Sequence, residues 1–346
     1  MSNQAQLIFL ISQPRSGSTL TQKILGNHSK IHTISEPWVL LHPFYALRHE
    51  GHTADYNAQW ARKVLDTFFE YLPQGKETYI THIAQAYKNM YGEILEGSNK
   101  EFFLDKTPRY FHIIPELSAA FPEAHFILLF RNPIAVLCSV IKTWINCGNW
   151  LDLHLYKHDI LHAPHLLIEG SKLLDGRAMT MQYEKLTENP AAAVPNLCRH
   201  LNIEYEEVML DYDSTNSKKW KLGDQENVYK YQKPNSSNST HWIKDLENPQ
   251  VWRLIHDYLN YLGPDVFQSM GYDFNNLQKT IANCHPGNLK LWNTIPLRYL
   301  LEEPSHLPSI DYGQALLRLA TVCQKENLIG IVNRLGKKLI NSNKAK

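Results

Sequence analysis

The sequence predicts an α/β fold built around a mostly parallel sheet. Two observations predict this class. Short apolar runs alternate with longer helical patterns over roughly the first 200 residues, which is typical of βαβ units. Each run also has about the length of a strand that is covered on both faces.

The apolar runs give the expected strands, which are Leu7–Ile11, Ile31–Ile34, Phe102–Asp105, His125–Phe130 and Ala178–Tyr183. Helices are expected at Ser18–Asn27, Tyr56–Tyr71, Ile80–Leu95, Pro108–Phe121, Pro133–Cys147 and Ala191–Leu201. In the second and third of these helices, apolar residues recur three and four positions apart. A further helix, Val251–Leu262, is expected to close with Gly263 and Pro264.

The chain is expected to divide near residue 275. Residues 1–275 form the predicted catalytic domain, and residues 276–346 form an extension that is irregular and then helical over Tyr312–Leu339. This extension either packs on the core or pairs with a second subunit, which would make a homo-oligomer through the C-terminal helices. Residues 211–245 are polar, so they form either a loop that orders over a ligand or a plain surface loop.

Composition excludes several classes of function. Lys and Arg number 35 against 34 Asp and Glu, and no basic stripe stands out, so nucleic-acid binding has no electrostatic support. Five scattered cysteines predict neither a disulfide framework nor a zinc knuckle. The apolar start is too short for a signal peptide or a membrane span, so we expect a cytoplasmic protein that binds no membrane.

A glycine-containing loop joins the first strand to the first helix. It reads Pro14-Arg15-Ser16-Gly17-Ser18-Thr19-Leu20. Backbone N–H groups converge at such a helix start and can hold a phosphate or sulfate, to which Arg15 adds charge and Ser16, Ser18 and Thr19 add hydroxyl donors. The lysine of a Walker A loop is missing, which disfavours an ATP–Mg²⁺ kinase. A plain helix cap is the alternative interpretation.

A second strand-to-helix junction begins at Arg131. Asn132 can cap the following helix, and Pro133 suits its first position. Arg131 leaves the strand tip, where open α/β sheets bind ligands, and Ser139 lies near the same helical face. The alternative is that Arg131 makes a surface ion pair while Ser139 fills a gap in the packing.

Two charged residues follow other expected strands. Lys106 ends one strand just before Pro108, and Glu36 directly follows another, beside Trp38. Desolvation there can raise the proton affinity of the Glu36 carboxylate, as a general base for a hydroxyl requires. An ion pair with Arg15 or Lys106, without proton transfer, is the alternative for Glu36. Four histidines remain candidate bases, namely His32, His42, His112 and His154.

These motifs resemble those of the sulfotransferases that use 3′-phosphoadenosine 5′-phosphosulfate (PAPS). The loop Pro14–Leu20 resembles the family's 5′-phosphosulfate-binding loop, and Arg131 with Ser139 has the spacing of its 3′-phosphate site. The string Asp105-Lys106-Thr107-Pro108 resembles the Lys-Ser/Thr-Pro motif of the carbohydrate-type and bacterial branches. Pro108 stands where the cytosolic aryl and steroid branch has a histidine base. Glu36 is similar in position to the catalytic glutamate of several Golgi and bacterial members.

Two looser matches complete the resemblance, which covers roughly residues 7–273. Tyr183 corresponds to a strand-end tyrosine that lies against adenine, although a tyrosine on a strand is more often a core residue. Lys233 is a weak substitute for the family's late nucleotide-covering loop, since the Arg-Lys-Gly of the cytosolic branch is absent.

The resemblance implies a P-loop-like fold with three layers, α/β/α. It also implies in-line sulfuryl transfer from PAPS to a hydroxyl or amine of a small-molecule acceptor, for which we favour a specialised metabolite. Glu36 would take the acceptor's proton, and Arg15, Lys106 and Ser16 would hold the developing charge as 3′,5′-adenosine bisphosphate leaves. No metal is expected, because the sequence has neither an Asp-rich motif that could bind Mg²⁺ nor a His/Cys cluster with the spacing of metal ligands.

Two alternatives come from other classes of protein. One is a P-loop phosphotransferase that uses a nucleoside triphosphate and needs a divalent metal. The other is a nucleotide-binding partner protein in which Glu36 and Lys106 are chemically inert. The Arg131 and Ser139 pair disfavours the first, since ATP has no 3′-phosphate, whereas only turnover distinguishes the second.

Overall fold

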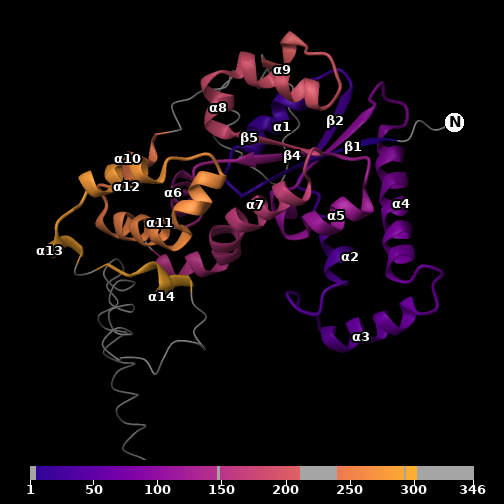
Figure 1. Cartoon of the computed structure of the whole chain (residues 1–346), viewed down its shortest axis with the longest axis horizontal. Coiled ribbons are helices and arrows are strands. Elements are labelled where there is room, and N and C mark those ends of the chain that lie inside the picture. The colour runs from indigo at the N-terminus through magenta and orange to yellow at the C-terminus, as the bar shows by residue number, and fades with distance from the viewer. Residues whose placement is uncertain (1–4, 146–148, 211–239, 292–293, 302–346) are drawn as a thin grey trace, which may run out of the picture.

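A computed structural model describes residues 5–145, 149–210, 240–291 and 294–301. Its centre is one parallel sheet with the strand order β2-β3-β1-β4-β5 (Figure 1). The strands are β1 (Gln6–Ser12), β2 (Ile31–Ser35), β3 (Phe102–Lys106), β4 (His125–Phe130) and β5 (Ala178–Gln182). All five expected strands are confirmed. The last one ends a residue early, because Tyr183 already begins helix α8 (Tyr183–Glu188).

The register of the sheet places the two charged residues of the predicted site together. Ser35 of β2 pairs with Lys106 of β3, and Lys106 pairs with Leu10 of β1 on its other side. Glu36 therefore leaves the sheet beside Lys106. Because all strands are parallel, the loop after β1 opens at this same carboxyl edge, where open α/β sheets bind ligands.

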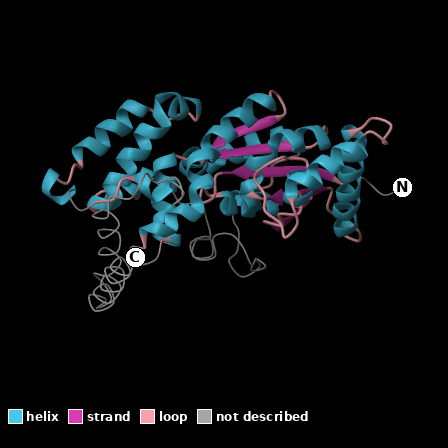
Figure 2. Cartoon of the chain, turned by 90° about the horizontal axis from the view of Figure 1, so that it is seen from below, coloured by secondary structure: helices cyan, strands magenta, loops and turns pink. Residues whose placement is uncertain are grey.

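Helices cover both faces of the sheet, as the three-layer expectation requires (Figures 1 and 2). One face packs on α1 (Ser18–Gly26), α8 and α9 (Pro190–His200), and its strands contribute Ile8, Leu10, Leu104, Ile127 and Leu129. Alternate strand residues point to the opposite face, where a larger core cluster includes Leu7, Phe9, Ile11, Phe126 and Leu128. This alternation is the two-residue period of a strand that is buried on both sides.

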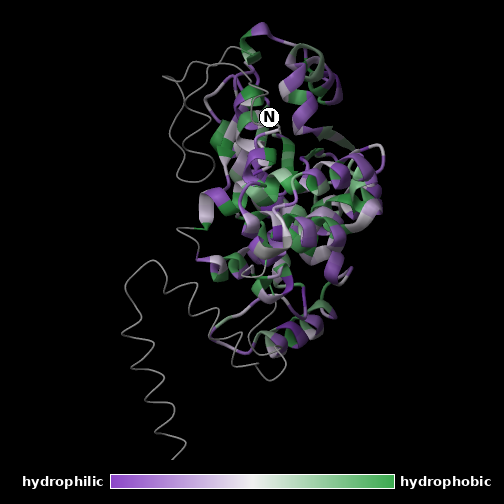
Figure 3. Cartoon of the chain, turned by 90° about the vertical axis from the view of Figure 1, so that its left-hand side faces the viewer, coloured by the Kyte–Doolittle hydropathy of each residue, from purple (hydrophilic) through white to green (hydrophobic). Residues whose placement is uncertain are grey.

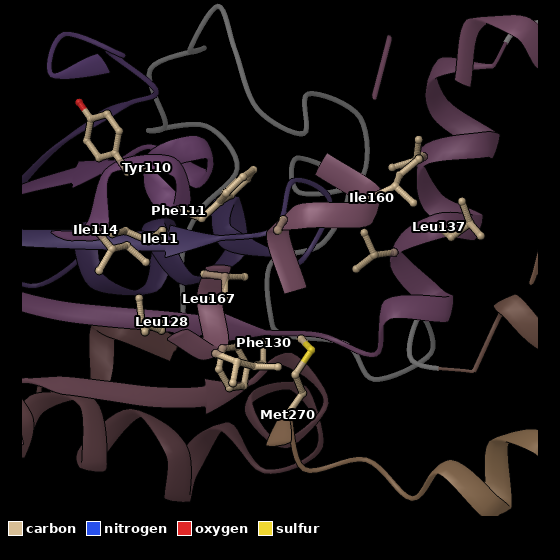
Figure 4. Close-up of a cluster of buried hydrophobic side chains, with 14 of the residues drawn as sticks. Ile11, Tyr110, Phe111, Ile114, Leu128, Phe130, Leu137, Ile160, Leu167 and Met270 are labelled. Atoms are coloured by element: carbon tan, nitrogen blue, oxygen red, sulfur yellow. The ribbon is translucent and has the colours of Figure 1, made fainter. Parts of the chain in front are cut away.

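The larger core contains side chains from widely separated parts of the chain. Figure 4 shows Ile11 and Leu128 from the sheet beside Tyr110, Phe111, Ile114 and Leu167. Helix α5 (Ile114–Ala120) and helix α7 (Ala163–Leu173) pack against each other in this layer. Figure 3 shows hydrophilic and hydrophobic residues interleaved along the helices, as expected for helices that bury one face.

The other helices differ from the expectations mainly at their ends. Helices α3 (Ala58–Phe69), α4 (Lys76–Leu95) and α6 (Pro133–Trp144) are confirmed with small shifts, and Pro108–Ile113 is a 3-10 turn, η1, ahead of α5. Helix α11 (Pro249–Ser269) is interrupted at Gly263, where φ is +71°, and then continues beyond the expected end. The elements not predicted are α2 (Leu41–Tyr45), α7, α8, α10 (Trp242–Asp245), α12 (Phe274–Asn283), α13 (Asn288–Leu291), α14 (Leu297–Leu301), the 3-10 helices η3 (Trp150–Tyr156) and η5 (Glu207–Leu210), and the π-helix η4 (His158–His162).

Residues just after the expected domain boundary pack on α11. The indole of Trp252 donates to the carbonyl of Ile281 at 2.9 Å, and Leu277, Ile281 and Leu300 are buried. The expected helix Tyr312–Leu339 and most of the expected polar loop lie outside the described residues. Within the described part of the chain, no helix has the length and apolar character needed to cross a membrane.

Candidate active site

The loop after β1 has the geometry of an anion-binding cradle. Arg15 and Gly17 adopt positive φ angles of 68° and 88°, and the N–H of Ser16 donates back to the carbonyl of Gln13 at 3.2 Å. Gly17 is the N-cap of α1 and, having no side chain, makes no capping hydrogen bond of its own. The helix then begins with Ser18 and Thr19, both buried. The N–H groups of such a helix start can hold an oxyanion.

Ser16 gives this cradle an unsatisfied polar atom. Its side chain is fully buried, and its hydroxyl oxygen has no hydrogen-bond partner among the described residues. A buried hydroxyl without a partner is costly, at about 1–3 kcal/mol. A phosphate or sulfate oxygen in the cradle would satisfy it. The residues present therefore fit the 5′ end of a phosphosulfate donor.

Tyr183 packs directly on this loop. A Cβ atom added to Gly17 would lie 2.2 Å from Cδ2 of Tyr183, so the ring rests against the glycine backbone. The guanidinium of Arg131 lies over the same ring, 4.5 Å from its centroid. Tyr183 is only 6% exposed and is thus part of the wall between the two predicted phosphate sites. Its contact with adenine remains a prediction.

Arg15 connects the predicted 5′ and 3′ sites. Its carbonyl oxygen accepts a hydrogen bond from Nη1 of Arg131 at 2.7 Å, and its own Nε donates to the hydroxyl of Ser139 at 3.2 Å. The start of α6 is fixed independently, because the side chain of Asn132 accepts from the N–H of Ile134. The structure thus brings Arg15, Arg131 and Ser139 into one cluster, as a donor with phosphates at both ends requires.

Lys106 and Glu36 form a partly buried ion pair at the ends of β3 and β2. The Lys106 Nζ atom lies 2.9 Å from Oε1 of Glu36, and the Lys106 side chain is fully buried. The N–H of Glu36 also donates to the carbonyl of Lys106 at 2.8 Å. Burial lowers the pKa of Lys106, while the Glu36 carboxylate opposes that shift. The ion pair that the sequence offered as the alternative for Glu36 is present. Glu36 also lies at the carboxyl edge of the sheet, where a general base would be needed, so its role as the base stays a prediction.

Glu36 is held in a strained conformation. Its φ angle is +51° and that of Trp38 is +57°, a region that non-glycine residues rarely occupy. The indole N–H of Trp38 donates to the second carboxylate oxygen, Oε2, at 3.4 Å. Such strain persists only where the surroundings fix the backbone, and it concentrates at functional sites.

A buried carboxylate beside Lys106 was not singled out in the sequence. Asp105 accepts hydrogen bonds from the hydroxyls of Tyr91 at 2.9 Å, Tyr110 at 3.0 Å and Thr107 at 2.8 Å. Burial raises the pKa of Asp105 to about 6, and the hydroxyl donors limit the rise. This network anchors the end of β3. No sequence signal marks it, since the two tyrosines come from different elements.

Arg109 and Asp159 form a second ion pair that the sequence reasoning missed. Nε of Arg109 donates to Asp159 at 3.0 Å and Nη2 donates at 2.5 Å, so the pair is bidentate. The Arg109 guanidinium lies 5.1 Å from the ring centroid of Trp38 and 5.9 Å from that of Trp144. The only available signal was the position of Arg109, three residues after Lys106.

The four histidines that remain candidate bases lie in different environments. Burial, together with His158 and Arg48, lowers the pKa of His112 to about 3, which makes it a weak base near neutral pH. His32 stacks on Phe103, with ring centroids 5.9 Å apart. His154 lies in η3, where its Nδ1 atom is buried and has no hydrogen-bond partner among the described residues. His42 lies in α2.

Two further expectations concern ligands. Lys233 lies outside the described residues, so its predicted role has no structural counterpart here. In the part of the chain that the structure describes, no group of three or more His, Cys, Asp or Glu side chains is arranged to hold a metal ion.

The structure is that of an α/β protein in which a strand-to-helix loop suited to an oxyanion and a Glu–Lys ion pair lie at the carboxyl edge of the parallel sheet. A sequence profile described as "Sulfotransferase family" matches residues 7–207 of the chain. The chain therefore belongs to the sulfotransferase family.

Comparison with curated proteins gives partial matches. The nodulation protein NoeE of Sinorhizobium fredii is 33% identical over 139 residues, which is 40% of this chain and 32% of that protein. An uncharacterized protein of Aquifex aeolicus is 25% identical over 60% of this chain and 27% of its own length. The matches thus span about a third or less of these two relatives. A putative protein-tyrosine sulfotransferase of Caenorhabditis briggsae is 24% identical over 78% of this chain and 92% of its own.

Two solved sulfotransferase domains have folds similar to that of this chain. The sulfotransferase domain from the curacin biosynthetic pathway has a TM-score of 0.44 and 20% identity, covering 69% of this chain and 90% of that domain. The sulfotransferase domain from the Synechococcus PCC 7002 olefin synthase has a TM-score of 0.45 and 21% identity, covering 70% and 88%.

Proposed function

We propose that this protein transfers a sulfuryl group from PAPS to a hydroxyl or amine of a small-molecule acceptor, of the specialised-metabolite kind. Membership of the sulfotransferase family supports this reaction class. The observation that carries the choice of donor is the cluster around Arg15, which joins the helix-start cradle to Arg131 and Ser139. A donor with only a 5′ phosphate chain would leave the Arg131 end of that cluster unused.

The chemical step is an in-line displacement at sulfur. The acceptor oxygen or nitrogen forms a bond to sulfur while the bond from sulfur to the bridging oxygen breaks, and that oxygen keeps the electron pair. Glu36 takes the acceptor's proton. The cradle N–H groups, Ser16 and Arg15 hold the charge that develops on the leaving 3′,5′-adenosine bisphosphate, and such preorganised donors commonly supply the largest share of catalysis.

Lys106 links the base to the leaving group. It is paired with Glu36 at 2.9 Å, so the carboxylate proposed to take the acceptor's proton is engaged by the Lys106 ammonium group. When the donor binds, its bridging oxygen gives Lys106 a second anionic partner. A shift of Lys106 toward that oxygen would release Glu36 for proton transfer. The same movement would thus activate the base and stabilise the leaving group.

Calorimetric titration with 3′,5′-adenosine bisphosphate and with AMP tests the donor. Charge-assisted hydrogen bonds contribute roughly 1.5–3 kcal/mol each, so the bisphosphate should bind at least about tenfold more tightly than AMP. Arg131→Ala should remove most of this preference and leave AMP affinity nearly unchanged. Arg15→Ala should weaken both ligands alike, because both carry the 5′-phosphate. Equal affinity of the unmodified protein for the two nucleotides would contradict PAPS as donor.

Turnover separates the remaining candidates. A screen of hydroxyl and amine acceptors with labelled PAPS, read by mass spectrometry for the added SO₃ group, identifies the acceptor. A nucleotide-binding protein without chemistry would bind the bisphosphate and transfer nothing. A phosphotransferase would lose activity with EDTA and regain it with Mg²⁺, whereas sulfuryl transfer by these residues should continue in the chelator.

A further inference from the structure

Arg109 of η1 and Asp159 of η4 form a polar contact beside the proposed base that the sulfuryl-transfer chemistry has not used. We infer that Arg109 binds the acceptor, that Asp159 positions Arg109, and that the bound group is a pair of uncharged oxygens, such as a diol that includes the reacting hydroxyl. This inference rests on the proposed function, since it concerns the acceptor of that reaction.

The hydrogen bonds of Arg109 leave one edge of its guanidinium unoccupied. Nε and Nη2 both donate to the Asp159 carboxylate, which is 4% exposed. A guanidinium carries five N–H groups, and this pairing uses the side edge only. No hydrogen bond is formed by Nη1 to any described residue, and the Arg109 side chain is 24% exposed. The end edge, Nη1 with the second N–H of Nη2, is a fork for two oxygen atoms.

The surroundings fix where this fork lies. Trp38 contacts both the proposed base and Arg109. Its indole N–H donates to Glu36, and its ring lies under the Arg109 guanidinium. Trp144 lies under Arg109 and Arg15, 5.9 Å from each guanidinium carbon. Arg109 therefore shares one aromatic neighbour with the proposed base and another with the donor-binding arginine. An acceptor bound to the free edge of Arg109 would lie close to the residues that act on it.

Charge selects the kind of oxygen group. Arg15, Arg131, Lys106 and Arg109 carry four positive charges, and Glu36 and Asp159 carry two negative charges. A bound donor adds the negative charges of its sulfuryl, 5′-phosphate and 3′-phosphate groups, so the occupied site is already anionic. An acceptor carboxylate or phosphate would be repelled, whereas hydroxyl or carbonyl oxygens can accept the fork's hydrogens without that penalty.

Steady-state kinetics of the full chain test this role, with PAPS and the best acceptor from the screen. Arg109→Gln should raise the acceptor KM at least about tenfold and keep the bisphosphate Kd within about twofold. Asp159→Asn should raise KM less, and Arg109→Lys should rescue little, since an ammonium cannot form the fork. The matched control is Arg253→Gln, which breaks another Arg–Asp pair, on helix α11, in which Nε of Arg253 donates to both carboxylate oxygens of Asp257. It should change neither constant.

An analogue of the acceptor without the second oxygen gives an independent readout. With the unmodified protein it should show a KM raised about tenfold, and with Arg109→Gln the two acceptors should become nearly equal. An unchanged KM in Arg109→Gln, a preference for a carboxylate-bearing analogue, or a best acceptor without a neighbouring oxygen would each overturn the inference. Absence of any transfer by the unmodified protein, despite bisphosphate binding, would instead refute the proposed function and the inference with it.

Discussion

Glu36 and Lys106 combine ion pairing with the proposed proton transfer, so they are best separated by an isosteric change. Glu36→Gln keeps an oxygen for the Lys106 ammonium but cannot take a proton at neutral pH. Turnover should fall by about 10²–10⁴, the usual contribution of general acid–base catalysis. Bisphosphate binding, measured by calorimetry, should stay within about threefold. Near-normal turnover would exclude Glu36 as the base and direct attention to His154 and His42.

Asp105 gives a pH dependence with a defined sign. Its pKa in the folded protein is about 6, above the usual value of 3.8. A carboxyl whose pKa rises on folding stabilises the fold most below its unfolded pKa, and it loses that contribution as pH rises through its folded pKa. The free energy of unfolding contributed by Asp105 should therefore decrease between about pH 4 and pH 6, by up to about 3 kcal/mol.

Denaturant unfolding of the unmodified protein and of Asp105→Asn across this range measures that contribution. Asparagine keeps an acceptor for the surrounding hydroxyls and does not titrate. The stability difference between the two proteins should shift in favour of Asp105→Asn as pH rises from 4 to 6. A difference that is constant with pH would show that the folded carboxyl has no raised pKa.

At the scale of elements, the turn between β1 and α1 depends on Gly17. Its φ of +88° disfavours any side chain, and a Cβ atom there would overlap the ring of Tyr183. Gly17→Ala should therefore destabilise the fold and displace Tyr183 from its place over Arg131. We expect bisphosphate affinity to fall at least about tenfold, because both predicted phosphate sites touch this ring.

Gly176 offers a matched control for that change. It also has a positive φ, +71°, but an added Cβ would meet no atom within 4 Å. Gly176→Ala should cost only the backbone strain, about 1 kcal/mol, and leave bisphosphate affinity unchanged. Thermal unfolding and calorimetry of both variants compare the two effects. Equal losses of affinity would mean that the loop responds to general destabilisation and not to the Tyr183 contact.

The sequence was most informative where one local rule decides the structure. The five strands follow from apolar runs, and the start of α6 follows from Asn132 and Pro133, whose cap and first-turn roles the structure confirms. Helix α7 was missed although it packs in the core, because Pro164 and three nearby histidines obscure its apolar period. Short helices such as α2 carry too few residues to show a period at all.

The site residues also divide into those that a local sequence rule could identify and those that it could not. Glu36, Lys106 and Arg15 stand beside strand ends, so topology places them at one edge and the sequence could identify them. Asp159 lies far along the chain in a π-helix and reaches the site only through tertiary packing. Neither its partner Arg109 nor the hydroxyl network of Asp105 has a spacing signature. Such contacts depend on how elements distant in the sequence pack against each other, and the hydrophobic periodicity of each element does not predict that packing.

For the whole molecule, the extent of the catalytic domain is the remaining question. The expected boundary near residue 275 remains a prediction, but α12 and α14 contribute buried side chains to the main core, among them Ile281, Leu297 and Leu300. The backbone N–H of Leu297 also donates to Asp257 of α11 at 3.0 Å. Helices α12 and α14 therefore share the core with α11.

Two truncations distinguish a boundary at 275 from a domain that extends to α14. Ending the chain after residue 301 retains every described contact of α12 and α14, whereas ending it after residue 275 exposes their apolar partners. Each fully buried aliphatic side chain that is lost costs about 1.5–3 kcal/mol, so the shorter protein should unfold at a Tm at least about 5 °C below that of the longer one. Bisphosphate binding should persist in the longer protein, since the cradle, Arg131 and Ser139 lie before residue 140. Equal Tm values for the two truncations would instead support a domain that ends near residue 275 and an extension that packs without stabilising it.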